Sequence, residues 1–134
     1  MPVKKEIKNI LIVDDDVLQL KLLEGILKSN GYAISIATEA DEGLDKAINN
    51  DPDLIILDVM MPVINGYNFC RLLKKEAGKS EILIILLTSR DELQDIQIGL
   101  EMGADAYLTK PVHTDELLKT IRFVGSMESN KDSN

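Results

Sequence analysis

The stretch Leu54-Ile55-Ile56-Leu57-Asp58-Val59-Met60-Met61-Pro62-Val63-Ile64-Asn65-Gly66 decides the fold of this chain. Its first four residues are apolar without polar alternation, a pattern typical of a strand that is buried on both faces of a parallel α/β sheet. Asp58 follows at once and precedes a loop with the turn-forming pair Asn65-Gly66. A carboxylate at the carboxyl end of such a strand lies where open α/β sheets bind ligands, although by itself it is equally a helix N-cap or turn residue.

The composition is that of one globular domain. The chain has 134 residues, of which 28% are charged and 45% apolar, ordinary values for a soluble protein. The apolar run at 10–13 is too short for a signal peptide or a membrane span, so we expect a cytoplasmic protein without membrane insertion. The single Cys70 excludes an internal disulfide, and the net charge of −8 without any Trp argues against direct nucleic-acid binding.

Hydrophobic periodicity and capping residues divide the chain into alternating strands and helices. The predicted strands are 8–13, Ala33–Ala37, 54–57, 82–87 and Ala106–Thr109. The predicted helices are Val17–Ser29, 39–49, 67–75, 91–102 and 114–124, with Thr38 as an N-cap and with Asn30-Gly31 and Gly103 as helix ends.

Five strands alternating with five helices predict an α/β fold with a doubly wound, five-stranded parallel sheet of order 2-1-3-4-5, which is flavodoxin-like. Right-handed crossovers would place helices on both faces of this sheet. We expect the domain to cover residues 8–124. The polar segment 125–134 is interpreted as a disordered tail, and its composition also suits the start of a linker.

Three carboxylates come directly after apolar strands, namely Asp14, Asp15 and Asp58. The first and third strands are neighbours at the switch point of the predicted sheet, so these acids would meet in one crevice. Like charges at such short range need a cation, and two or three carboxylates without His or Cys suit Mg²⁺.

Thr88 ends the fourth predicted strand and Lys110 ends the fifth, on the same edge of the sheet. They would bring a hydroxyl group and an ammonium group to the acid cluster. Conversion of Asp58 into an acyl phosphate would add negative charge and acceptor oxygens that can draw these two groups in. Aspartate is an established nucleophile toward phosphorus.

Five motifs in this order resemble the receiver domain of two-component response regulators, over about residues 8–124. They are Asp14-Asp15, Leu57-Asp58-Val59-Met60-Met61-Pro62, Thr88-Ser89, the run Gly103-Ala104-Asp105-Ala106-Tyr107-Leu108-Thr109, and Lys110-Pro111. The resemblance implies a cytoplasmic phosphoprotein of a two-component phosphorelay that acts in signal transduction and is not an enzyme in the usual sense, with slow autodephosphorylation.

The resemblance also implies roles by position. Asp58 matches the phosphoacceptor, which receives the phosphoryl group from a histidine kinase or a histidine phosphotransfer protein. Asp14 and Asp15 match the Mg²⁺ ligands, and Met60 matches the residue whose backbone carbonyl binds the metal.

The remaining positions implied by the family concern the switch. Thr88 and Lys110 match the pair that contacts the phosphoryl group. Tyr107 matches the aromatic residue that swings inward when Thr88 moves, and its alternative role is that of a strand-edge aromatic packed on the helix at 91–102.

Met60 and Arg90 resemble positions that tune hydrolysis of the phosphoryl group. Because one is apolar and the other cationic, we hypothesise that together they limit attack by water and give a long-lived phosphorylated state. His113, one residue after Lys110-Pro111, is interpreted as a loop or cap residue.

Two helices carry candidate partner surfaces. The apolar residues of Val17–Ser29 extend beyond one core stripe, which fits either docking of a kinase or phosphotransfer protein or burial between neighbouring elements. Ile98 lies off the face shared by Leu93, Ile96 and Leu100. It therefore suits the surface formed by helix four, strand five and helix five, which similar proteins use for output or for homodimers.

Three rival interpretations share parts of this pattern. A phosphatase of the haloacid dehalogenase type would match Asp14-x-Asp16, but it would need Thr or Val where Leu18 stands, and a cap insertion. A flavin-binding module of the same fold would need a phosphate loop where the acid triplet lies. The third rival is a receiver-like interaction module whose phosphorylation is idle.

Overall fold

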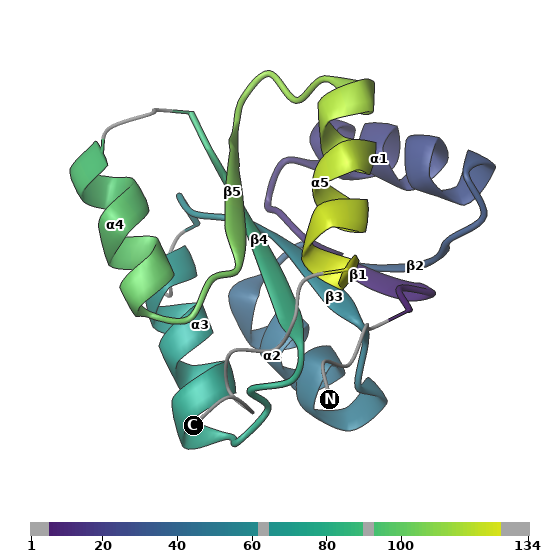
Figure 1. Cartoon of the computed structure of the whole chain (residues 1–134). Helices are drawn as coiled ribbons and strands as arrows, with labels where there is room; N and C mark the ends of the chain where they lie inside the picture. Colours follow the sequence, from purple (N-terminus) through teal and green to yellow (C-terminus); the bar gives the residue numbers. More distant parts are fainter. Residues whose placement is uncertain (1–5, 62–64, 90–92, 127–134) are drawn as a thin grey trace.

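The computed structural model describes residues 6–61, 65–89 and 93–126 as a three-layer α/β structure (Figure 1). Its sheet contains β1 (Asn9–Val13), β2 (Ala33–Ala37), β3 (Leu54–Asp58), β4 (Leu83–Thr88) and β5 (Ala106–Thr109). Neighbouring strands pair in parallel in the order β2-β1-β3-β4-β5. The predicted fold class and strand order are therefore confirmed.

The helices are α1 (Val17–Ser29), α2 (Ala40–Asn50), α3 (Gly66–Arg71), α4 (Leu93–Glu101) and α5 (Thr114–Ser126), and the π-helix η1 (Leu72–Glu76) continues α3. Helices α1 and α5 cover one face of the sheet, whereas α2, α3 and α4 cover the other (Figure 1). Both faces of the central strands are thus buried, which explains their unbroken apolar sequences.

Each face of the sheet has its own apolar core. Alternate residues of the strands point to opposite faces, so that Ile55 and Leu57 of β3 join the cluster under α2 and α3, while Leu54 and Ile56 join the cluster under α1 and α5. Phe69 of α3 is fully buried in the first of these clusters. This packing fixes the strands whose ends carry the acids.

Two predicted helix ends are confirmed and one predicted cap is wrong. Gly31 after α1 and Gly103 after α4 both have positive φ angles, of 94° and 116°, as left-handed helix ends require. Thr38 is not the N-cap of α2, because that position is Glu39 and its side chain makes no capping bond. Instead, the Glu42 carboxylate accepts the N–H of Thr38 at 3.0 Å.

The predicted helix at 67–75 is interrupted by a change of helix type. From Leu72 the chain forms a π-helix, in which the N–H of Ala77 donates to the carbonyl of Leu72 at 2.8 Å. The wider turn buries both Leu73 and Lys74. The Lys74 ammonium lies 2.6 Å from the carboxylate of Asp105, and only 5% of the Lys74 side chain is exposed.

The carboxyl end of α5 lies beyond its predicted position. The helix continues past Val124 to Ser126, and Gly125 is buried in its last turn. The predicted helix end at Val124 is therefore two residues too early, because Gly125 and Ser126 belong to α5. Residues 127–134 lie outside the described residues, as do Arg90, Pro62–Ile64 and the predicted helix start at Asp91.

The exposure of apolar side chains agrees with the sequence prediction on α1 and differs from it on α4. On α1, Val17, Leu18 and Leu22 are exposed, with 83% of Leu18 accessible. On α4, however, Leu100 is exposed and Ile98 is half-buried.

Within the described residues, every helix is too short or too polar to cross a membrane.

Cys70 of α3 provides a chemical probe of this fold. Burial raises the pKa of its thiol to about 12, and the reactive form of cysteine is the thiolate. We therefore expect a disulfide reagent at pH 8 to react on the order of a thousand times more slowly with the native protein than with the unfolded protein. The measurement is the release of the chromophore with and without denaturant. Rapid reaction of the native protein would contradict the buried position of Cys70.

Candidate functional site

The register of β1 and β3 brings two carboxylates together. Val13 pairs with Leu57, so that Asp14 and Asp58 follow side by side at the carboxyl edge of the sheet. Asp15 joins them, and one carboxylate oxygen from each of these three residues lies within 4.8 Å of the others. The predicted convergence of the three acids is present in the structure.

Backbone donors hold the two buried acids. The carboxylate of Asp14 is fully buried and accepts the N–H of Asp16 at 2.9 Å. Asp58, also buried, accepts the N–H of Met60 at 3.2 Å. The second oxygen of Asp14, Oδ2, is buried without a hydrogen-bond partner among the described residues. Such an unsatisfied oxygen is suited to a cation.

Lys110 is the cation that faces both acids. Its ammonium lies 3.4 Å from Oδ1 of Asp58 and 3.6 Å from Oδ2 of Asp14. The N–H of Lys110 donates to the carbonyl of Thr88 at 2.7 Å, which joins the ends of β4 and β5. The peptide bond between Lys110 and Pro111 is cis.

The electrostatic balance of the cluster is unfavourable without a further cation. The pKa of Asp14 is raised to about 6, chiefly by burial and in part by the negative charge of Asp58. The Asp16 N–H and the Lys110 ammonium act in the opposite direction. One Lys therefore compensates two buried carboxylates and the exposed Asp15 only in part.

Three of the other predicted residues, Thr88, Met60 and Tyr107, lie within the described part of the chain. Thr88 ends β4 and is buried. Met60 follows Asp58 by two residues, and its side chain is 71% exposed. Tyr107 lies on β5 with 39% of its surface accessible, so its ring is in an outward position. Arg90 lies outside the described residues.

Three residues near the cluster have structural roles that the sequence did not indicate. Asp16 caps α1, since its carboxylate accepts the N–H groups of Leu18 and Gln19 at 3.0 and 3.3 Å. The Asn65-Gly66 pair, read as a turn former, supplies a helix cap and a close packing contact. Asn65 Oδ1 accepts the N–H of Asn68 at 3.0 Å, and a Cβ atom built on Gly66 would lie only 2.9 Å from Cα of Val59.

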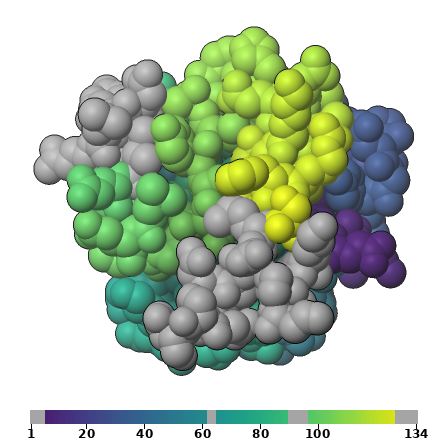
Figure 2. Space-filling view, viewed as in Figure 1, coloured from purple at the N-terminus to yellow at the C-terminus, as the bar shows by residue number. Residues whose placement is uncertain are grey.

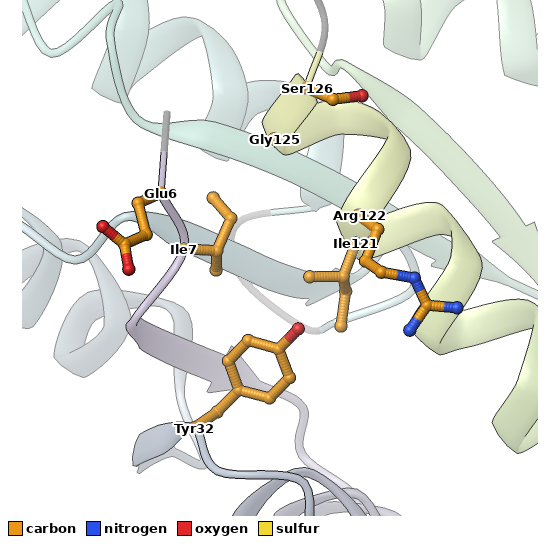
Figure 3. A pocket seen from close by; sticks show the side chains of 7 residues that line it. All are labelled: Glu6, Ile7, Tyr32, Ile121, Arg122, Gly125 and Ser126. Atoms are coloured by element: carbon orange, nitrogen blue, oxygen red, sulfur yellow. The ribbon is translucent and has the colours of Figure 1, made fainter. Parts of the chain in front are cut away.

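A pocket of about 290 Å³ lies at the opposite edge of the sheet (Figure 3). Ile7, Tyr32 and Ile121 form its apolar wall, and the charged groups of Glu6 and Arg122 lie on opposite sides of the Tyr32 ring (Figure 3). None of the predicted site residues contributes to it. The predicted site residues at the carboxyl edge therefore lie away from this pocket.

Comparison with known families agrees with this arrangement. The model of the response regulator receiver domain matches residues 10–122. The chain belongs to the response regulator receiver family. This match sets aside the phosphatase and flavodoxin alternatives, and it includes every residue of the carboxylate cluster.

Curated relatives of this receiver domain include longer regulators. It is 41% identical over 124 residues to the response regulator ArlR of Staphylococcus haemolyticus, covering 92% of this chain and 55% of that protein. It is 39% identical over 117 residues to the alkaline phosphatase synthesis transcriptional regulatory protein PhoP of Bacillus subtilis, covering 87% of this chain and 48% of that protein. The chain thus spans about half the length of these relatives.

Solved structures support the same assignment. The receiver domain matches the chemotaxis protein CheY4 of Vibrio cholerae with a TM-score of 0.83 and 31% identity, covering 89% of this chain and 99% of that one. It matches a CheY-like response regulator receiver domain protein of Methanospirillum hungatei with a TM-score of 0.81 and 34% identity, covering 90% and 94%.

The burial of Asp14 predicts an unusual dependence of stability on pH. Because its folded pKa is raised from 3.8 to about 6, the folded state binds the proton more tightly than the unfolded state does. The stability from protonated Asp14 is present in full below pH 4 and is lost as the pH rises through 6, by roughly 2 to 3 kcal/mol. Denaturant titrations of the protein in chelator, from pH 4 to pH 8, measure this change.

Asp14→Asn is the matched variant for this measurement. Its amide has a similar size and no charge, so the decrease in unfolding free energy between pH 4 and pH 7 should be smaller than in the wild type. Identical pH profiles for the two proteins would show that Asp14 is not held in a charge-disfavouring environment.

Proposed function

We propose that this receiver domain is a phosphorylation switch of a two-component system, in which Asp58 accepts a phosphoryl group from a histidine kinase or a histidine phosphotransfer protein. The observation that carries the proposal is the cluster at the carboxyl edge. Asp58 lies there within 4.8 Å of Asp14 and Asp15, and 3.4 Å from the ammonium of Lys110. The family match supports the same assignment.

The transfer needs a nucleophile and charge compensation. A carboxylate oxygen of Asp58 attacks the phosphorus of the phosphohistidine and the phosphorus–nitrogen bond breaks. The imidazole, which already carries a proton on its other ring nitrogen, takes the bonding electron pair and leaves as the neutral base. The Lys110 ammonium, already 3.4 Å from Asp58, would bind the phosphoryl oxygens. The Thr88 hydroxyl would donate to another of these oxygens.

The donor set fits Mg²⁺. Asp14, Asp15, Asp58 and the backbone carbonyl of Met60 would hold it, and Oδ2 of Asp14 is a buried oxygen that lacks a hydrogen-bond partner among the described residues. When bound, the ion would neutralise charge on the transferred group. All of these ligands are oxygen atoms, which is the preference of Mg²⁺.

The proposed output pathway starts at Thr88. As Thr88 moves toward the phosphoryl group, Tyr107 would turn inward from its exposed position. Helix α4, β5 and α5 share one face of the molecule (Figure 2). Leu100, Tyr107 and Phe123 of these elements are exposed, which supports this face as the surface for an output protein or a second copy.

The kinase or phosphotransfer protein would bind near the site, on α1. The exposed Val17, Leu18 and Leu22 of α1 follow the acid triplet directly and form an apolar surface.

We propose that the protein acts in the cytoplasm as a signalling protein, with slow loss of its own phosphoryl group.

Intact-protein mass spectrometry tests the switch. The protein is incubated with a small acyl-phosphate donor, with and without Mg²⁺. We expect one phosphoryl adduct that requires Mg²⁺ and is lost in Asp58→Asn, because the amide cannot attack phosphorus.

The matched control is Asp16→Asn, since Asn also caps helices and Asp16 lies outside the three-acid cluster. This variant should form the adduct as the wild type does. An adduct that persists in Asp58→Asn would contradict the assigned acceptor. Folded wild type without any adduct, from this donor and from a phosphohistidine protein, would favour the idle interaction module.

The lifetime of the phosphorylated state is a separate prediction. The exposed Met60 side chain follows the acceptor by two residues, and an apolar group there disfavours an ordered attacking water. We expect a half-life much longer than seconds at neutral pH in Mg²⁺, measured as decay of the adduct after the donor is removed. Decay within seconds would contradict this hypothesis.

A further inference from the structure

One buried side chain, Leu86 of β4, lies between two glycines from different parts of the chain. A Cβ atom built on Gly99 of α4 would lie 2.6 Å from Cδ1 of Leu86, and one built on Gly66 would lie 3.4 Å from its Cδ2. The two methyl groups of Leu86 therefore face the backbones of α4 and of the first turn of α3. Only glycine allows the approach at α4, since carbon atoms normally pack 3.5–4.0 Å apart.

Gly66 connects the packing of Leu86 to the backbone that follows Asp58, the proposed phosphoacceptor. Its N–H donates to the carbonyl of Val59 at 2.9 Å, and Val59 follows Asp58 directly. A Cβ atom on Gly66 would also lie 2.9 Å from Cα of Val59. Gly66 thus packs closely against the backbone after Asp58, and Leu86 is its neighbour on the other side at an ordinary van der Waals distance from the built Cβ atom.

The carboxyl end of α4 is anchored independently. The carboxylate of Asp105 binds the Lys74 ammonium at 2.6 Å and the N–H of Ile84 at 2.9 Å. The stem of Lys74 lies against Gly103, where a Cβ atom would be 3.0 Å from its Cδ. Helix α4 lies beside α3 (Figure 1), and Asp105 ties the loop that follows α4 to η1 and to β4.

We propose that Leu86 is a mechanical relay: a displacement of the backbone after Asp58 moves Gly66, which pushes Leu86 against Gly99 and shifts α4 about its anchored carboxyl end. The contact acts through close packing and is separate from the hydroxyl of Thr88 and the ring of Tyr107. Its use in signalling rests on the proposed function, whereas the coupling itself exists without phosphorylation.

A double-mutant cycle tests the coupling in the unphosphorylated protein. The variants are Gly99→Ala, Leu86→Val and the double variant, and the readout is the amide signal of Gly66 in ¹H–¹⁵N NMR spectra. Valine keeps strand propensity but lacks the two δ-methyl groups that reach the glycines. We expect Gly99→Ala to shift the Gly66 amide signal, and we expect that shift to be lost in the Leu86→Val background.

Gly25→Ala is the matched control, because Gly25 lies within α1 and a Cβ atom there would meet nothing within 4 Å. It makes the same chemical change in a helix and should leave the Gly66 signal unmoved. An unmoved Gly66 signal in folded Gly99→Ala would overturn the relay. Persistence of the shift in the Leu86→Val background would overturn it as well.

A separate NMR measurement tests the proposed role of Leu86 in signalling. After treatment with the acyl-phosphate donor, the adduct is counted by mass spectrometry, and the amide signals of Leu100 and Gly103 are compared with those before treatment. In Leu86→Val the adduct should still form, while the movement of these signals is lost. A wild type that forms no adduct would contradict the proposed function, and the cycle above would still decide the coupling.

Discussion

The burial of two neighbouring carboxylates with one ammonium is the constraint on which the rest of the site depends. At a separation of about 4 Å and an effective dielectric constant near 20, two like charges repel by roughly 4 kcal/mol. Asp14 and Asp58 lie side by side with Lys110 facing both. Burial, together with the negative charge of Asp58, raises the pKa of Asp14 even though Lys110 acts in the opposite direction. Anything that adds positive charge to this crevice is therefore stabilised there, whether a proton or a divalent ion.

The sheet makes this arrangement rigid. The register of β1 with β3 fixes the spacing of Asp14 and Asp58, and the pairing of Thr88 with Thr109 brings Lys110 to the same edge. Apolar clusters on both faces hold these strands in place. The unfavourable charge pair is thus stabilised by packing elsewhere in the domain, which is how strained functional sites persist in folded proteins.

The sequence predicted what depends on local pattern. Strand order, the meeting of Asp14, Asp15 and Asp58, and the glycine ends of α1 and α4 follow from apolar runs, topology rules and φ angles. The π-helix η1 and the burial of Lys74 could not be predicted in this way. The burial of Lys74 is matched by its ion pair with Asp105, which lies 31 residues further along the chain, whereas a lysine is normally expected at the surface.

The wrong or incomplete details of the prediction have the same origin. Thr38 has the chemistry of an N-cap, but the chain enters α2 one residue later and Glu42 reaches back to it. Ile98 was expected at the output surface but is half-buried, and Leu100 is exposed, because the sequence pattern does not show how α4 is rotated on the sheet. That rotation is set by the close approach of Gly99 to Leu86 and Tyr67, a contact between α4, β4 and α3.

The contact between Gly99 and Leu86 also indicates why packing can carry a signal across the domain. Repulsion between carbon atoms rises steeply below their normal contact distance, so a side chain held between two glycine backbones has little room to absorb a displacement. A hydrogen bond, in contrast, tolerates several tenths of an ångström. With Gly66 beside the acceptor backbone, Gly99 on α4 and Lys74–Asp105 holding the far end of that helix, a small movement at Asp58 is more readily passed on than lost. Glycine at position 99 then serves the contact with Leu86, while glycine at position 66 serves the close approach to the backbone of Val59.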